Sequence, residues 1–141
     1  MYIMIVARGY PTDKDKMNGI FEFDQAKALV EAGHKVVYAA VDVRSIRRWR
    51  IWGIEKKNIE GVNVYAINIP LGRIPKGILY KIRKYGLDIL YKLILREQGK
   101  PDVIHAHFTS MGFITSNLKN KKSIPFVITE HLSTMMKPVI D

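Results

Sequence analysis

Five short apolar runs alternate with segments of helical periodicity, and this alternation constrains the fold of the chain more than any other feature. The runs cover residues 2–7, 34–41, 62–69, 102–107 and 125–129. Each run is apolar at successive positions, as in parallel strands that are buried on both faces. Strands that alternate with helices pair in parallel through right-handed crossovers. We therefore predict a Rossmann-like α/β domain, a parallel sheet flanked by helices.

Three segments between these runs are expected to be helices. Asn18 suits the N-cap of a helix over residues 18–33, and Gly33 suits the left-handed position that ends it. A long helix is expected over residues 77–98 and a short one over residues 109–119. The long helix repeats apolar side chains at helical spacing, and these define its predicted buried face: Ile78, Ile82, Tyr85, Ile89 and Leu93. The 141 residues fit one such domain.

The carboxyl ends of the predicted strands are the expected ligand site. Ligands of open parallel sheets bind beyond these ends, where the strand order reverses. The first loop of this edge ends in Asn18 and Gly19, at a helix start whose N–H groups and dipole favour an anion. Gly19 has no side chain, so a phosphate can approach its backbone closely. A glycine here also suits a tight turn that binds no ligand.

A nicotinamide dinucleotide site is a weaker interpretation of the same loop. Its fingerprint, G-x-G-x-x-G, follows the first strand directly. Here Gly9 and Gly19 are ten positions apart and a charged loop separates them. Asp42, after the second run, resembles the acid that binds a ribose, but the glycine spacing argues against this site.

His105 and His107 lie one residue apart at the end of the fourth run. Alternate residues of a strand share a face, so both imidazoles are expected to point the same way. A metal site would need further ligands, which Glu130 and His131 would supply. We favour a hydrogen-bonded core imidazole for His105. His107 is the last residue of the run, and we expect it to face the ligand crevice.

The positive charge of the chain is concentrated in its middle. The net charge is +10, and residues 44–100 hold 14 Lys/Arg against four Asp/Glu, which accounts for all of it. This indicates an anionic partner, although a solvated basic surface is the simpler alternative. The chain has no cysteine, which excludes disulfides and thiolate sites and fits a reducing cytoplasm.

Within this region, cations and indoles interleave over residues 44–57, on a helix or turn. Such a surface suits an interfacial contact with an anionic membrane. Its members are Arg47, Arg48, Trp49, Arg50 and Trp52. Two alternatives remain: the tryptophans pack under the sheet edge, or the segment binds nucleic acid. The sequence contains no recognisable nucleic-acid-binding motif, so no specific nucleic-acid partner is expected.

Three segments in order, MNGIFEFDQAKALVEAGHKVV, PDVIHAHF and IPFVITEH, resemble the N-terminal half of family-4 retaining glycosyltransferases. The resemblance implies the GT-B architecture, two Rossmann-like domains that face each other across a cleft. It implies that Gly19, with Asn18 beside it, faces the diphosphate of a nucleotide-sugar donor, and that His107 is a catalytic residue beside the donor sugar. Glu130 and His131 match a loop at the cleft floor, and we group Arg44 with them as cleft or acceptor residues.

The same resemblance implies a glycan or lipid-linked acceptor, retention of the anomeric configuration, and no divalent metal or other cofactor. Activity at the inner face of the membrane would agree with the basic segment. In this family a C-terminal domain holds the nucleotide through an E-x7-E pair, and no two glutamates here have that spacing. We therefore expect residues 1–141 to be an acceptor-side domain that is inactive without that partner domain. Half of a sugar-nucleotide epimerase is the remaining alternative.

Overall fold

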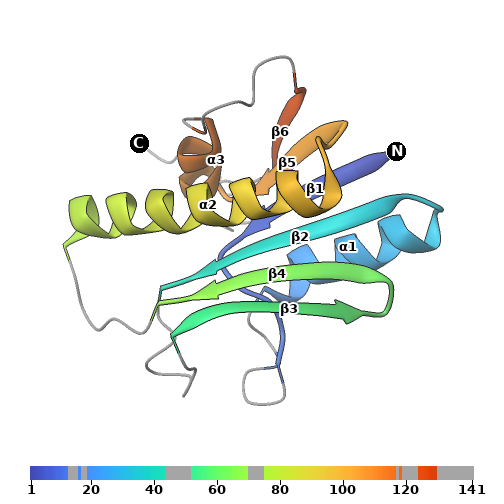
Figure 1. Ribbon diagram of the computed structural model, residues 1–141, viewed down its shortest axis with the longest axis horizontal. Coiled ribbons are helices and arrows are strands. Elements are labelled where there is room, and N and C mark those ends of the chain that lie inside the picture. The colour runs from blue at the N-terminus through green and yellow to red at the C-terminus, as the bar shows by residue number, and fades with distance from the viewer. Residues whose placement is uncertain are drawn as a thin grey trace, which may run out of the picture.

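The computed structural model describes residues 1–12, 16, 19–43, 52–69, 75–116, 118 and 124–129. Within them the chain forms a mixed α/β domain (Figure 1). The strands are β1 (Tyr2–Ala7), β2 (Lys35–Asp42), β3 (Gly53–Ile59), β4 (Val62–Asn68), β5 (Val103–His107) and β6 (Phe126–Thr129). The helices are α1 (Ile20–Glu31), α2 (Lys76–Gln98) and α3 (Thr109–Ser116).

The strands form one sheet in the order β3-β4-β2-β1-β5-β6. Four neighbouring pairs are parallel, as predicted: β1 with β2, β1 with β5, β2 with β4, and β5 with β6. The apolar runs at the centre of the sheet are buried on both faces, because helices cover both sides. The predicted Rossmann-like fold is therefore confirmed.

The antiparallel edge strand β3 corrects the prediction of an all-parallel sheet. Residues 53–57 belong to the basic segment that was expected to be a helix or turn, but residues 53–59 form a strand that pairs with β4 through a two-residue turn. Glu60 and Gly61 form this turn with φ of 50° and 86°, the left-handed values that a tight hairpin requires. β3 is partly exposed and rich in lysine, so its sequence contains no apolar run. Lysine side chains on an edge strand disfavour pairing with strands of other chains.

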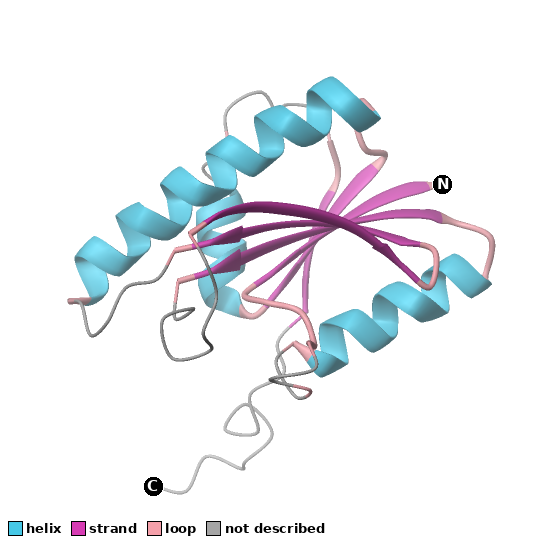
Figure 2. Cartoon of the chain, turned by 60° about the horizontal axis from the view of Figure 1, so that its bottom comes forward, coloured by secondary structure: helices cyan, strands magenta, loops and turns pink. Residues whose placement is uncertain are grey.

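Helices cover both faces of the sheet (Figure 2). On one face, Phe23 and Ala26 of α1 pack on a cluster that includes Ile5 and Tyr38. On the other face, α2 and α3 pack on a larger cluster: Met4, Val6, Val37, Ile104, Leu87, Leu90, Ile94, Met111 and Ile114. Side chains alternate along a strand, so β1, β2 and β4 each contribute buried residues to both clusters.

The buried face of α2 agrees with the predicted one only in part, because Ile82, Ile89 and Leu93 are partly buried against the core and the other two residues are exposed. Ile78 is 50% exposed and Tyr85 is 63% exposed, whereas the next stripe, which includes Leu87 and Leu90, is buried. Gly86 explains this choice, because a Cβ there would lie only 3.2 Å from a methyl group of Val41. Gly86 lets α2 approach the sheet closely along the stripe that includes Leu87 and Leu90. The first turns of α2 extend past the carboxyl ends of β2 and β4 (Figures 1 and 2).

The helix ends agree with the predictions in part. Gly19, with φ of 65°, is the N-cap of α1, and the predicted cap Asn18 lies outside the described residues. Gly33 has the expected left-handed conformation after α1, with φ of 94°. No helix within the described ranges combines the length and the apolar character needed to cross a membrane.

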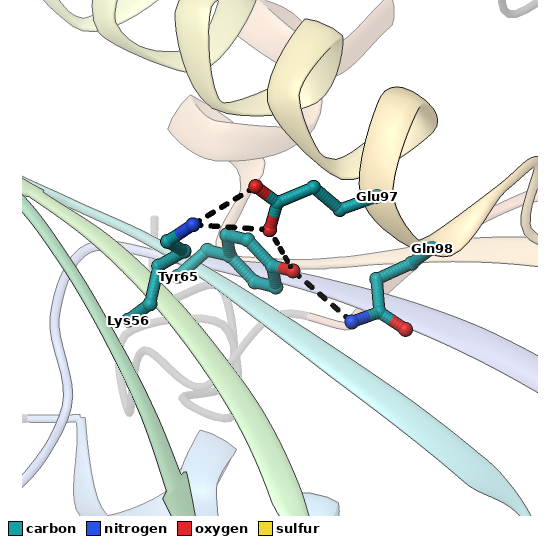
Figure 3. Close-up of polar contacts among 4 residues, drawn as sticks. All are labelled: Lys56, Tyr65, Glu97 and Gln98. Atoms are coloured by element: carbon teal, nitrogen blue, oxygen red, sulfur yellow. Dashed lines mark hydrogen bonds and ion pairs between the residues drawn. The ribbon is translucent and has the colours of Figure 1, made fainter.

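The C-terminal end of α2 is fixed to β3 and β4 by side-chain hydrogen bonds (Figure 3). Tyr65 on β4 donates to the Glu97 carboxylate over 2.8 Å and accepts from the Gln98 amide over 3.0 Å. Lys56 on β3 lies 2.9 Å from the Glu97 carboxylate. The ammonium group of Lys35, the first residue of β2, donates to the carbonyl of Gln98 over 3.3 Å. We call this group of contacts the amino edge; it extends from the middle of β3 and β4 to Lys35, where β2 begins.

Candidate functional site

The strand order reverses between β1 and β5, at the centre of the sheet. From β1 the chain proceeds to β2 and β4 on one side, and it later returns to β5 and β6 on the other. In open parallel sheets a ligand binds at such a point, beyond the carboxyl ends of the strands. Arg8 and Phe108 are the residues that directly follow β1 and β5. We refer to this end of the sheet as the carboxyl edge.

The loop after β1 is anchored by two tyrosines. Tyr38 donates its hydroxyl hydrogen to the carbonyl of Gly9 over 2.6 Å, and Tyr10 donates to the Glu55 carboxylate over 2.8 Å. Burial, with the nearby Glu22 carboxylate, raises the pKa of Tyr38 well above its ordinary value, so this hydroxyl remains a donor. The backbone next to Arg8 is therefore held in a defined position.

Gly19 packs directly on this loop. A side chain at Gly19 would overlap the carbonyl of Gly9, and its left-handed backbone disfavours any other residue. The turn-forming role considered for Gly19 is thus confirmed. A role in phosphate binding stays a prediction, and the need for glycine at this position does not test it.

Glu22 adds a negative charge that the sequence analysis missed. It lies in the first turn of α1, is 3% exposed, and has a carboxylate oxygen 3.0 Å from the position that a Gly19 Cβ would take. A carboxylate is stabilised by the positive end of a helix dipole. Glu22 occupies the third position of α1, where the capping-box pattern places a glutamate. This spacing from the helix start is the sequence feature from which its position could have been predicted. A phosphate near Gly19 would therefore need a cation to offset Glu22.

The two histidines of β5 lie on the α1 side of the sheet. His105 and His107 stack with their ring centroids 4.4 Å apart. The Nε2 atom of His105 lies 2.6 Å from the Thr129 hydroxyl on β6, which confirms the predicted hydrogen bond, but His105 is half-buried and not the core residue that was expected. His107 ends β5 as expected, but it has no exposed surface. Its ring stacks on His105 and is enclosed in this structure, so the expected contact with a ligand stays a prediction.

Phe108 makes the turn from β5 into α3. Its φ of 72° is left-handed, which is uncommon for a bulky residue. Its N–H donates to the carbonyl of Thr129 over 2.7 Å, and its carbonyl accepts from Gly112 over 3.0 Å. The Cζ atom of Arg8 lies 4.0 Å from the centroid of the Phe108 ring. This cation–π contact joins the carboxyl ends of β1 and β5.

These contacts place the two predicted site residues near each other. Gly19 packs on Gly9, the preceding residue Arg8 stacks on Phe108, and Phe108 directly follows His107. Arg8 and Phe108 were not among the predicted residues. Their positions just after two strands are visible in the sequence, but only the strand order shows that these two strands are neighbours.

Most of the remaining candidates fall outside the described residues. They are Asn18, Arg44, Arg47, Arg48, Trp49, Arg50, Glu130 and His131. Trp52 is described and is 61% exposed, which contradicts the alternative that it packs under the sheet edge. Asp42 is buried at the end of β2, beside Asn68. The part of the chain that the structure describes contains no group of three His, Asp or Glu residues placed to hold a metal ion.

The strand order and the helices on both faces define a Rossmann-like domain. The sequence identifies its family: residues 23–138 match the family described as Glycosyltransferase Family 4. The chain therefore belongs to Glycosyltransferase Family 4, as the resemblance predicted. No curated protein matches the chain significantly.

Solved structures with the same fold are glycosyltransferases of the GT-B type. The catalytic domain of starch synthase IV from Arabidopsis thaliana, bound to ADP and acarbose, is similar with a TM-score of 0.61 and 17% identity, over 93% of this chain and 34% of that one. Sucrose-phosphate synthase from Thermosynechococcus elongatus is similar with a TM-score of 0.63 and 16% identity, over 94% of this chain and 33% of that one. The chain thus spans about a third of these structures, and the similarity confirms an N-terminal GT-B domain.

Proposed function

We propose that this chain is the acceptor-side domain of a retaining glycosyltransferase, which transfers a sugar from a nucleotide-sugar donor to a glycan or lipid-linked acceptor. One structural observation supports this proposal in addition to the family membership. The Gly19 turn and the His107 strand end are linked at the switch point by the contact of Arg8 with Phe108. The starch synthase structure contains ADP, which supports a nucleotide-linked donor.

The proposed chemistry matches the groups at the carboxyl edge. Breaking a sugar–diphosphate bond develops positive charge on the sugar and negative charge on the leaving phosphate. N–H groups at the start of α1, next to Gly19 and Asn18, would stabilise the phosphate, at about 3 kcal/mol per donor by analogy with oxyanion holes. We propose that His107 orients the donor sugar. Because His107 is buried, this contact requires the groups around it to shift when the donor binds.

The proposal includes a second domain that supplies the nucleotide site. Residues 1–141 correspond to about a third of the similar structures, so the present chain alone is expected to be inactive. We assign Glu130, His131 and Arg44 to the cleft or acceptor side. The reaction is proposed to need no divalent metal, so a chelator should leave transfer unchanged.

The basic segment is proposed to contact an anionic membrane surface from the cytoplasmic side. Its residues are Arg47, Arg48, Trp49, Arg50 and Trp52. The exposed indole of Trp52 supports this role, since an amphipathic ring suits the lipid interface. Co-sedimentation with anionic but not neutral liposomes, weakening with salt, is the expected result. Equal sedimentation with both would contradict the membrane contact.

The transfer proposal is tested with the complete gene product and a panel of labelled nucleotide sugars. We expect one or a few donors to be consumed with retention at the anomeric carbon, measured by NMR of the product. Inversion of configuration would contradict the retaining mechanism. Turnover by residues 1–141 alone would contradict the proposed need for a second domain.

A further inference from the structure

We propose that the first three turns of α2 dock on an anionic lipid surface through the side of the helix that points away from the sheet. We call this side the outer face of α2 and define it by Ile78, Lys81 and Tyr85. The inference goes beyond the proposed function, because it assigns a lipid-binding surface to a helix outside the basic segment. It does not require the basic segment to contact the membrane.

The outer face lies opposite the buried face of the same helix. Ile78, Lys81 and Tyr85 follow one another at i, i+3 and i+7, which places them on one side of an α-helix. All three are exposed, whereas Leu87 and Leu90 on the other side are buried in the core. The helix therefore presents a branched apolar side chain, a lysine and an aromatic ring together on its outer face.

The charge of this part of α2 is one-sided. Residues 76–87 contain four Lys/Arg and no Asp/Glu. Lys84 pairs with Asp88 at 3.2 Å. Lys76 and Lys81 are exposed, and neither forms an ion pair with a described residue. Acids are favoured at the positive end of a helix dipole, and the first turn of α2 has none, so an anionic surface would stabilise this end of the helix.

The apolar residues of the outer face favour lipid over other anionic partners. The phosphates of a nucleic acid would be bound by the lysines, and Ile78 would stay exposed to water beside them. At a lipid interface, isoleucine enters the acyl boundary, tyrosine suits the headgroup level, and lysine extends its ammonium group to the anionic headgroups. Ile78, Lys81 and Tyr85 together therefore fit an anionic bilayer.

The position of the outer face would serve a lipid-linked acceptor. The first turns of α2 extend past the carboxyl ends of β2 and β4 (Figures 1 and 2). At the same end of the domain, the exposed Trp52 precedes Gly53, which pairs with the last residue of β4. Docking through α2 would place the carboxyl edge at the lipid surface, which favours a lipid-linked acceptor over a free glycan.

The test is flotation of the complete gene product with vesicles of phosphatidylcholine, alone or with an equal amount of phosphatidylglycerol, at physiological ionic strength. We expect binding to the mixed vesicles only. Lys81→Glu should weaken this binding about tenfold or more, and Tyr85→Ser about threefold. Lys92→Glu is the matched control, because Lys92 is exposed on the same side of α2 but about 16 Å further along it, beyond the Debye length. This control should weaken binding by no more than about twofold.

A label on α2 gives a second readout that does not depend on the affinity. The 141 residues contain no cysteine, and a Cβ at Gly77 would meet no atom within 4 Å. Gly77→Cys and Lys92→Cys can therefore each carry one environment-sensitive fluorophore on the 141-residue chain. With mixed vesicles we expect a blue shift of the emission for the label at residue 77 and a smaller shift for the label at residue 92.

Several results would overturn the inference. Lys81→Glu binds as tightly as the unchanged protein, or Lys92→Glu weakens binding equally, or the unchanged protein floats with both kinds of vesicle alike or with neither. Displacement from mixed vesicles by single-stranded RNA at equal phosphate concentration would also overturn it. Circular dichroism checks that each variant folds, and the label at residue 77 decides the matter if Lys81→Glu does not fold.

These outcomes are separable from the proposed function. Binding that Trp52→Ser abolishes and Lys81→Glu leaves unchanged would support the contact of the basic segment and overturn the role of α2. None of the flotation results would contradict sugar transfer, which the assay of the complete gene product with nucleotide sugars tests separately.

Discussion

The amino and carboxyl edges of the sheet hold their polar groups in different ways. At the amino edge, partly exposed side chains from α2, β3 and β4 satisfy one another at distances of 2.8 to 3.0 Å (Figure 3). At the carboxyl edge, Glu22, Asp42 and His107 are buried, and Gly19 and Phe108 have left-handed backbones. The first arrangement fixes a helix to the sheet, whereas the second gathers buried polar side chains where a ligand is expected.

This difference suggests a division of roles within one small domain. Buried polar side chains are costly unless they are satisfied, and they are common at functional sites. A network of exposed hydrogen bonds contributes modestly to stability. Changes at the amino edge should therefore alter stability alone, and changes at the carboxyl edge should alter ligand binding and transfer.

The largest effect is expected at Gly19. Gly19→Ala places a Cβ against the carbonyl of Gly9 in a left-handed backbone and should lower the free energy of unfolding by about 3 kcal/mol. Gly33→Ala is the matched control, because Gly33 is also left-handed but has open space around it. That change should cost about 1 kcal/mol. Equal costs in urea denaturation would contradict the packing of Gly19 on Gly9.

The next effect concerns the two histidines in the complete gene product. His107→Asn should lower kcat/KM for transfer about 100-fold, because it removes the group proposed to orient the donor sugar. His105→Asn is the neighbouring control and should lower stability, through the lost contact with Thr129, far more than it lowers transfer. A larger loss of transfer for His105→Asn would reverse the assignment.

A smaller effect is expected at the amino edge. Tyr65→Phe removes the hydrogen bond to Glu97 and the one from Gln98. It should lower the free energy of unfolding by about 1 kcal/mol and leave transfer by the complete gene product unchanged. Slower transfer by this variant would show that the two edges are coupled, against the division of roles.

The smallest effect is a pH dependence. The hydrogen bond from Lys56 holds the pKa of Glu97 below its ordinary value of 4.5. A lowered pKa in the folded state stabilises the protein above pH 4.5, and this contribution is lost as the pH falls through the folded-state pKa. The unfolding free energy of Glu97→Gln should therefore fall less steeply with acidification. Parallel curves for the variant and the unchanged chain would contradict this contribution.

The sequence predicts the parallel part of the fold because the central strands β1, β2 and β4 are buried on both faces, and because these strands, β5 and the partly exposed β6 are all short apolar runs. It does not predict β3, since that edge strand is exposed and its side chains carry no periodic apolar signal. The buried face of α2 is predicted only in part, because two apolar stripes lie side by side and the fully buried one is selected by the contact of Gly86 with Val41. Local patterns do not contain such tertiary preferences.

Like the fold, the candidate site is predictable from the sequence only in part. Gly19 and His107 follow from their places at a helix start and a strand end. The pairing of Arg8 with Phe108 does not, because 100 positions separate them and only the sheet order brings them together. The burial of His107 likewise depends on packing that a strand pattern cannot specify.

Hydrogen–deuterium exchange of the complete gene product, with and without its nucleotide-sugar donor, tests the central claim most directly. The claim is that the donor binds at the carboxyl edge between the start of α1 and the β5–α3 turn. We predict slower exchange in peptides that cover residues 19–23 and 107–112, and unchanged exchange at the amino edge around residues 97–102. Protection confined to the amino edge, or no protection in this domain while the donor is bound, would contradict the account.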